Sequence, residues 1–187
     1  RRNPGETGDD WKMQVVDRPG NMETAIGVDV DGDGQLDFLP NTVNSTVWYS
    51  LDDGRLVPHV ISPDQGGHGV GVGDVDGDGR SDILGPNGWF EAPDDAREGE
   101  WKFHDDWSLG GAGISIIVHD FDTDGLADVF WGMGHDYGLF WLKQGRDDAG
   151  NRTWTRSLVD DSWSQAHGLV LVDLDRDGTP EVGTGKR

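Results

Sequence analysis

The stretch Asp74-Val75-Asp76-Gly77-Asp78-Gly79-Arg80-Ser81-Asp82 decides how the rest of the chain is interpreted. Its acidic residues occupy positions 1, 3, 5 and 9 of a nine-residue loop, and a glycine occupies position 6. Calcium prefers about six to eight oxygen ligands, and acids on alternate residues of a tight turn can point inward together while glycine permits the sharp reversal. The stretch is therefore predicted to be a calcium-binding loop.

The same acidic pattern occurs four times, so up to four calcium ions are expected. Its carboxylates are Asp29, Asp31, Asp33 and Asp37, then Asp74, Asp76, Asp78 and Asp82, then Asp120, Asp122, Asp124 and Asp128, and finally Asp173, Asp175, Asp177 and Glu181. The backbone carbonyl at position 7 should complete each set, and the unrelated residues there are Gln35, Arg80, Leu126 and Thr179. For a single loop the alternative is a solvated Asp-Gly hairpin turn. Four copies at identical spacing favour calcium, and an EF-hand is excluded because position 12 never holds glutamate.

The loops recur with a period that is typical of propeller blades. Their first aspartates are 45, 46 and 53 residues apart. An apolar strand is expected before each loop and a second strand after it, followed by an aromatic strand and a fourth strand. The expected first strands are 25–30, 69–75, 114–118 and 169–172, the second strands are 36–39, 83–84 and 127–131, the third strands contain Trp48, Trp89 and Trp141, and the later fourth strands are 101–104 and 154–159. Four short strands in about 45 residues indicate a β-propeller blade.

The predicted fold class is therefore all-β, with residues 1–187 forming a single propeller segment. It contains three complete blades of four strands and partial blades on either side, because residues 11–16 resemble a fourth strand and the last repeat has only two strands. Two arrangements remain open. We favour a fragment of a larger ring, since rings usually close with complete blades. The other is a closed ring of four blades, completed by residues 11–16.

The composition narrows the classes of partner. The chain has 36 acidic and 15 basic residues and a formal charge of −21, which argues against nucleic acid and anionic membrane surfaces. No stretch approaches the roughly 20 apolar residues that span a bilayer. Dications and a neutral carbohydrate suit this charge better, and a protein partner is the alternative. Millimolar calcium outside the cell favours an extracellular or periplasmic location, although the lack of cysteine leaves the redox compartment open.

Three histidines are predicted to lie at the opposite end of the blades from the acidic loops. His68 and His167 each precede the first aspartate of their loop by six residues, and His135 follows the last aspartate of its loop by seven. Glu23 and Ile114 occupy the place of His68 in the other two repeats. The three histidines should therefore converge near a central channel.

Three interpretations of this histidine rim remain open. The first is a site for zinc or a similar metal with one open coordination position. The second is acid and base catalysis on a carbohydrate. The third is a set of separate histidines that cap neighbouring strands. His59, His104 and His119 fall elsewhere in the repeats and are expected to be structural.

The D-x-D-x-D-G-x-x-D loops at this period resemble the FG-GAP/VCBS-type repeats of calcium-binding propellers, as in integrin α-subunit heads and many secreted bacterial proteins. The resemblance covers nearly the whole chain. It implies a propeller and bound calcium, but adhesion, scaffolding and carbohydrate chemistry all occur on such propellers.

A more local likeness concerns Ser162–His167, Gly134–Gly138 and Thr184–Arg187. These stretches are similar to the propeller portion of aldos-2-ulose dehydratase-like proteins, in which metal-assisted dehydration of an oxidised sugar is implied. The expected function is a secreted, calcium-stabilised propeller that binds carbohydrate, with dehydratase or other carbon–oxygen lyase chemistry at the histidine rim as its enzymatic interpretation. The alternative is a non-catalytic adhesion or scaffold module of FG-GAP type.

Overall fold

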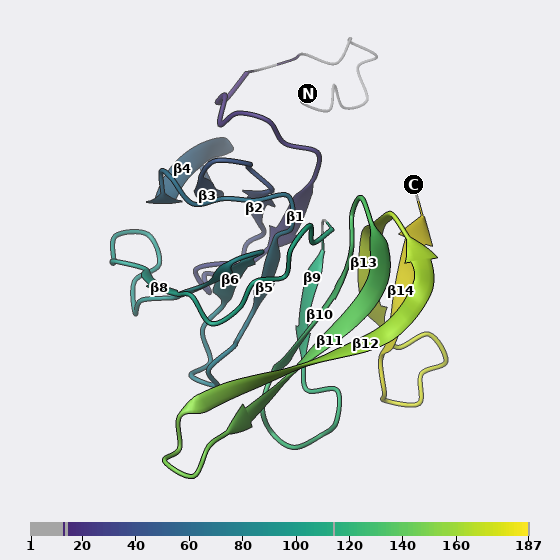
Figure 1. The fold of residues 1–187 in the computed structure, drawn as a ribbon. Coiled ribbons are helices and arrows are strands. Elements are labelled where there is room, and N and C mark those ends of the chain that lie inside the picture. Colours follow the sequence, from purple (N-terminus) through teal and green to yellow (C-terminus); the bar gives the residue numbers. More distant parts are fainter. Residues whose placement is uncertain (1–12, 14, 114, 187) are drawn as a thin grey trace.

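The computed structural model describes residues 13, 15–113 and 115–186, which form strands, turns and loops (Figure 1). The strands are β1 (Ala25–Val28), β2 (Asp37–Pro40), β3 (Thr46–Asp52), β4 (Arg55–Ser62), β5 (Gly71–Gly73), β6 (Asp82–Gly85), β7 (Gly88–Glu91), β8 (Lys102–His104), β9 (Ile116–His119), β10 (Asp128–Gly132), β11 (Tyr137–Arg146), β12 (Arg152–Ser164), β13 (Ala166–Val172) and β14 (Glu181–Lys186). Within this part of the chain, no helix is long and apolar enough to cross a bilayer.

The strands follow the repeat that the sequence predicts. Each acidic loop joins two antiparallel strands, β1 to β2, β5 to β6, β9 to β10 and β13 to β14. In the first three repeats the third and fourth strands continue as an antiparallel meander. The expected strand at 11–16 is not seen: residues 11, 12 and 14 lie outside the described part, and Met13, Val15 and Val16 are in no strand. Ile114 also lies outside it, and β9 begins at Ile116.

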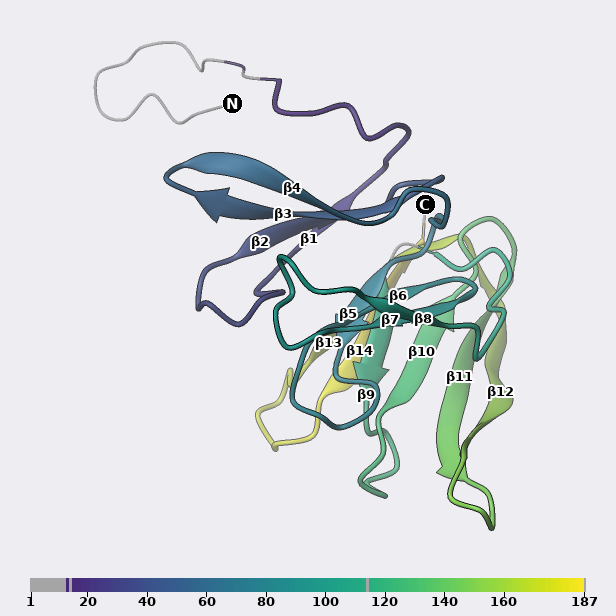
Figure 2. The same ribbon diagram turned by 90° about the vertical axis from the view of Figure 1, so that its left-hand side faces the viewer.

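The three meanders do not form three separate blades. The first is a four-stranded sheet, β1-β2-β3-β4, but the second and third merge into one eight-stranded sheet with the order β12-β11-β10-β9-β5-β6-β7-β8. Figures 1 and 2 show that this sheet is strongly curled and that the β13–β14 hairpin stands beside its β9–β10 region. No closed propeller is formed by the described residues, although the arrangement fits a partial one.

Glycine explains why two expected blades share one sheet. β5 pairs in parallel with β9, with Gly71 opposite Ile116 and Val72 opposite Ile117. A Cβ atom on Gly71 would lie 2.2 Å from the carbonyl oxygen of Ile116, so any larger residue would hold the two strands apart. The glycine-rich inner strand therefore lets two backbones pair where packed side chains would otherwise separate blades.

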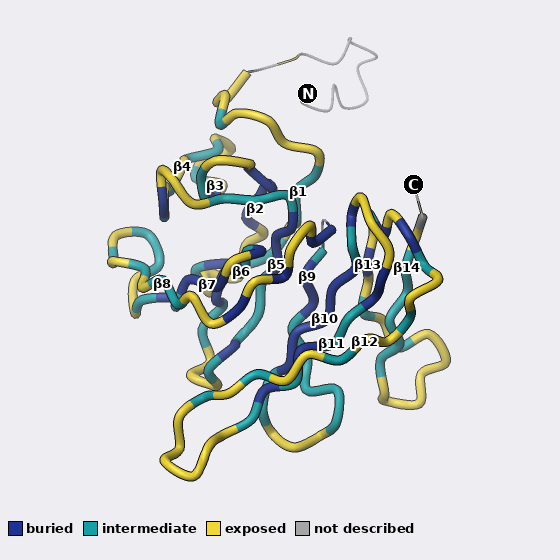
Figure 3. The backbone as a smooth tube through the Cα atoms, in the orientation of Figure 1, coloured by how far each residue is buried: buried dark blue, intermediate teal, exposed yellow. Residues whose placement is uncertain are grey.

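Buried residues concentrate along the strands of the meanders (Figure 3), and the core clusters between the meanders contain large aromatic side chains. Trp48, Trp89 and Trp131 are each 0% exposed. Asp106 links the second meander to the third, because it accepts hydrogen bonds from the indole nitrogens of Trp89 (3.0 Å) and Trp154 (3.3 Å). Burial alone would raise the pKa of Asp106, but these bonds and the nearby Arg152 lower it overall.

Candidate metal centres: four acidic loops and a histidine cluster

The four acidic loops share one backbone conformation. In every loop the residues at positions 4 and 6 have positive φ: Gly32 and Gly34, Gly77 and Gly79, Thr123 and Gly125, and Arg176 and Gly178. The positive φ at position 6 agrees with the glycine that the sequence pattern requires there. The positive φ at position 4 is not predicted by the pattern, although glycine occupies that position in two loops, as Gly32 and Gly77. Thr123 (φ 59°) and Arg176 (φ 64°) adopt a region that side chains with a Cβ rarely occupy.

Hydrogen bonds within each loop fix this conformation. In the second loop the carboxylate of Asp74 accepts the backbone N–H of Gly77 (2.7 Å) and that of Gly79 (2.9 Å). The bond from the position-6 glycine to the position-1 aspartate recurs in all four loops at 2.8–3.0 Å. The position-5 aspartate likewise accepts the N–H of position 7 in every loop. The loop is thus shaped by its own carboxylates.

The folded loops bring their first three acids together. Ligand oxygens of Asp29, Asp31 and Asp33 lie within 4.8 Å of one another, and the same holds for Asp74, Asp76 and Asp78 and for Asp120, Asp122 and Asp124. In the fourth loop the grouped residues are Asp173, Asp175 and Glu181, so the longer position-9 side chain takes the place of Asp177. Clustered carboxylate oxygens are the ligands that calcium prefers.

The position-9 aspartates have a second role that the sequence analysis did not identify. Asp82 is 0% exposed, and its two oxygens accept the backbone N–H groups of Val75 (2.8 Å) and Ala92 (2.9 Å). Asp128 is equally buried and accepts those of Phe121 and Gln144. Burial raises the pKa of Asp82 to about 7, against the lowering effect of the two N–H donors. The position-9 aspartates thus hold the end of the loop through buried hydrogen bonds to the backbone. That they also bind calcium stays a prediction.

Three of the loops also contact a basic side chain. Arg97, from the β7–β8 connection, reaches the first loop and pairs with Asp31 and with Asp33 (2.9 Å). Lys143 pairs with Asp122 and Asp124 in the third loop, and Arg80 with Asp78 in the second. Within the described residues, no ion pair reaches the acids of the fourth loop. The four loops are therefore electrostatically unequal, which their nearly identical sequences did not reveal.

The structure brings the three predicted rim histidines together. The ring centroids of His68 and His135 are 4.9 Å apart, those of His68 and His167 are 5.3 Å apart, and those of His135 and His167 are 4.8 Å apart. One nitrogen of each ring lies within 4.8 Å of the others. His68 comes from the β4–β5 connection, His135 from the β10–β11 turn and His167 from β13. Residues from three repeats thus form one cluster.

Backbone carbonyls orient two of these rings. The Nδ1 of His68 donates to the carbonyl oxygen of Ala112 (3.0 Å), and that of His167 donates to the carbonyl oxygen of Gln165 (3.2 Å). Because a carbonyl can only accept, the proton of His167 resides on Nδ1, and its Nε2 keeps a lone pair. The Nε2 of His167 is buried and has no hydrogen-bond partner among the described residues. This is the arrangement of metal-binding histidines, whose other nitrogen donates to a carbonyl or carboxylate.

Two further residues shape the histidine cluster. Glu23 places Oε2 3.3 Å from the Nε2 of His68, so the acid that replaces histidine in the first repeat also lies at this site. Gly134 allows the close packing, since a Cβ atom there would lie 2.7 Å from the Cε1 of His68.

The remaining histidines pack within individual sheets. His59 stacks on Trp48 at 4.2 Å, and His104 stacks on Trp89 at 4.3 Å. His104 also lies 2.7 Å from Glu91, whose pKa is lowered chiefly by this hydrogen bond. His119 packs edge-on against Phe121. These contacts agree with the structural role expected from the sequence.

Comparison with known proteins supports part of the expected identity. Residues 29–85, which contain the first two acidic loops and strands β2 to β6, match the model of an FG-GAP-like repeat. No curated protein matches the chain, so the likeness to aldos-2-ulose dehydratases gains no support. The protein therefore contains an FG-GAP-like repeat, and its D-x-D-x-D clusters could bind calcium.

Proposed function

We propose that the chain is a segment of a secreted, calcium-stabilised β-propeller whose histidine cluster binds a divalent transition metal, best matched by zinc, and through it a carbohydrate. The observation that carries the proposal is the buried, unpartnered Nε2 of His167. A buried nitrogen without a partner costs about 1–3 kcal/mol, and a metal ion would satisfy it.

The chemistry of the cluster suits zinc. Three neutral imidazoles are a common zinc ligand set, and they leave a fourth position for water or substrate. His135 is the exposed member of the cluster, so that position would open towards solvent. Glu23, beside His68, could complete the site or accept a proton from a bound ligand.

A metal with an open position would hold a hydroxyl or carbonyl oxygen of a sugar. If the ligand also carried a proton next to its carbonyl group, Glu23 could remove it and pass it to a neighbouring hydroxyl, whose C–O bond would break as it left as water to complete a dehydration. This lyase reaction is the catalytic form of the proposal. Calcium in the acidic loops would hold the strands that carry the histidines.

The proposal is tested by titrating the full chain with zinc, in a buffer that keeps calcium present. One zinc ion per chain should bind, and cobalt in its place should give the visible absorption of a site with few ligands. His167→Gln should weaken zinc binding by about a hundredfold or more. Even the loss of a residue that only hydrogen-bonds to a metal ligand lowers metal affinity by about 10–100-fold. His119→Gln is the matched control and should bind normally.

Equal zinc affinity in His167→Gln and the unchanged protein would exclude the histidine centre. The FG-GAP-like match would then favour the second candidate, a non-catalytic adhesion or scaffold module that presents its loops to a protein partner. That module should bind its partner without zinc, and removing the histidines should leave the binding unchanged.

A further inference from the structure

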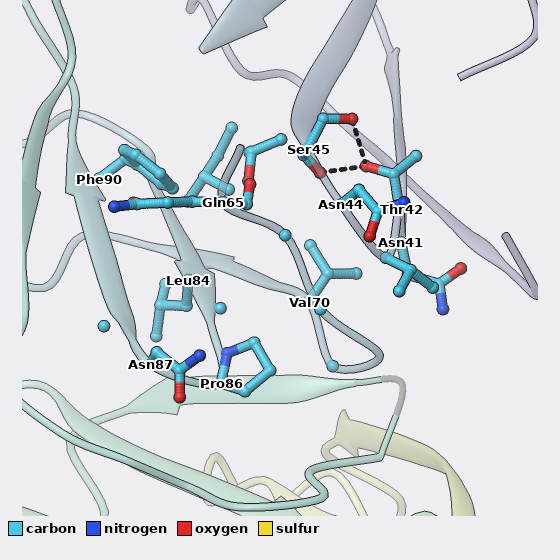
Figure 4. A pocket seen from close by; sticks show the side chains of 18 of the residues that line it. Asn41, Thr42, Asn44, Ser45, Gln65, Val70, Leu84, Pro86, Asn87 and Phe90 are labelled. Carbon is cyan, nitrogen blue, oxygen red and sulfur yellow. Dashed lines mark hydrogen bonds between the residues drawn. The ribbon is translucent and has the colours of Figure 1, made fainter. Parts of the chain in front are cut away.

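A cleft of about 360 Å³ lies between the first sheet and the second meander (Figure 4). It is lined by the β2–β3 connection, by the chain that leads from β4 to β5, and by the turn between β6 and β7. Small-molecule sites usually have volumes of about 300–1,000 Å³, so this cleft is large enough for a ligand of one or two sugar rings. None of the three clustered histidines lines it.

The walls of the cleft are preformed by close backbone contacts. A Cβ atom on Gly66 would lie 2.3 Å from the carbonyl oxygen of Thr42, and one on Gly67 would lie 2.5 Å from the ring of Pro86. The N–H of Gly67 also donates to the carbonyl of Thr42 (2.9 Å). The segment between β4 and β5 is thus fixed against both neighbouring walls, and a ligand would meet a cleft that already has its shape.

The lining combines an apolar floor with a polar rim. Val70, Leu84 and Phe90 line the cleft and are at most 5% exposed. In Figure 4, Asn87 lies on one side and Asn44 on the other. Asn44, Gln65 and Asn87 are exposed, and their side chains form no hydrogen bond with other described residues. Each amide therefore offers both donors and an acceptor to a ligand.

The charge of the cleft selects against anions. Among the residues that the structure describes, no lysine, arginine or histidine lines it, whereas Asp64 and Asp105 do. Two carboxylates in a protein of formal charge −21 would repel phosphate, sulfate or carboxylate groups. A neutral sugar suits such a lining, because its C–H face can cover the apolar floor while its hydroxyls meet the amides.

We infer that this cleft is a second ligand site, distinct from the histidine cluster, and that it binds a neutral mono- or disaccharide. The inference takes its ligand class from the proposed function but does not require the metal. The two sites share one backbone segment: Gly66, Gly67 and Gly69 line the cleft, and His68 extends from the same segment to the histidine cluster. The side chain of Asn41 holds this segment by donating to the carbonyl oxygen of His68 (3.0 Å).

The test uses the full chain in a buffer with calcium but without zinc. Saturation-transfer NMR and calorimetry are carried out with neutral probes, namely glucose, galactose, mannose and their common disaccharides, and with glucuronate and glucose 6-phosphate as anionic probes. At least one neutral probe should bind, and it should shift the side-chain amide signals of Asn87 and Gln65. The anionic probes should not bind.

Variants separate this site from the histidine centre. Asn87→Ala should weaken sugar binding by about three- to tenfold, the value of one hydrogen bond, and leave zinc binding unchanged. His167→Gln should retain sugar binding. Asn21→Ala replaces an exposed asparagine outside the cleft and should alter neither.

Three outcomes would overturn the inference. Sugar binding that needs zinc and ignores Asn87→Ala would place the ligand at the histidines, so the cleft would fail while the proposed function stood. Equal binding of glucose and glucose 6-phosphate would contradict the charge argument. Binding by none of the neutral probes would remove the cleft as a sugar site, whatever the zinc titration gave.

Discussion

Arg97 should compete with calcium at the first acidic loop. Its guanidinium pairs with Asp31 and Asp33, two of the three carboxylates that the loop brings together, and also with Asp52 (3.2 Å). A calcium ion in this loop would use the same two aspartates. Arg97→Gln removes the competing charge, so it should tighten calcium binding at the first loop.

The magnitude follows from the exposure of the pairs. The Arg97 side chain is 32% exposed, and ion pairs of this kind contribute about 0.2–1 kcal/mol each. Only the pairs with Asp31 and Asp33 compete with calcium, which gives about 1 kcal/mol. By linkage the dissociation constant of the first loop should fall about fivefold in Arg97→Gln. The difference should shrink at about 1 M salt, where screening is strong.

Calcium titration calorimetry measures this effect, with chelator competition for the tighter sites. Arg55→Gln is the matched control, because Arg55 is an exposed arginine in the repeat that contains the first loop and has no ion pair among the described residues. A double-mutant cycle is completed in the Asp31→Asn, Asp33→Asn background, which lacks the two carboxylates that pair with Arg97. In that background Arg97→Gln should not change calcium binding further. Unchanged calcium binding in Arg97→Gln would refute the competition, and weaker binding would refute it and show that the guanidinium supports the loop while calcium is bound.

Three further predictions concern stability. Removal of calcium with EGTA should lower the melting temperature by at least about 5 °C in a thermal scan, because one site at a hundredfold excess contributes about 2.7 kcal/mol; an unchanged melting temperature would contradict the calcium assignment. Thr123→Gly should stabilise the protein by about 0.5–1 kcal/mol in urea denaturation by relieving the positive φ at position 4, whereas Thr153→Gly in β12 should destabilise it. Asp106→Ala should lower the free energy of unfolding by about 2–3 kcal/mol, because it leaves the buried indole N–H of Trp89 without its acceptor. Asp105→Ala is the control and should leave the free energy of unfolding unchanged. Because the pKa of Asp106 is lowered on folding, this stabilisation is present above the unfolded pKa of about 3.9 and should be lost in urea denaturation as the pH falls through the folded value.

The sequence by itself determined the repeat and the groups that carry its chemistry. Alternate acids and a fixed glycine located the four loops, and the strand pattern around them is confirmed. Counting outward from the loops also predicted that His68, His135 and His167 converge, because residues at equivalent places in equivalent repeats lie at the same end of the strands. These features depend on local spacing, which a sequence displays directly.

The tertiary structure alone decided how the repeats combine. The pairing of Gly71 with Ile116, which merges two expected blades, depends on how closely two distant backbones approach. The placement of Arg97 against Asp31, the carbonyl of Ala112 that orients His68, and the cleft beside Asn87 likewise arise between segments far apart in the chain. Such contacts reflect distances and unsatisfied groups in three dimensions, and the spacing of residues along one repeat contains no record of them.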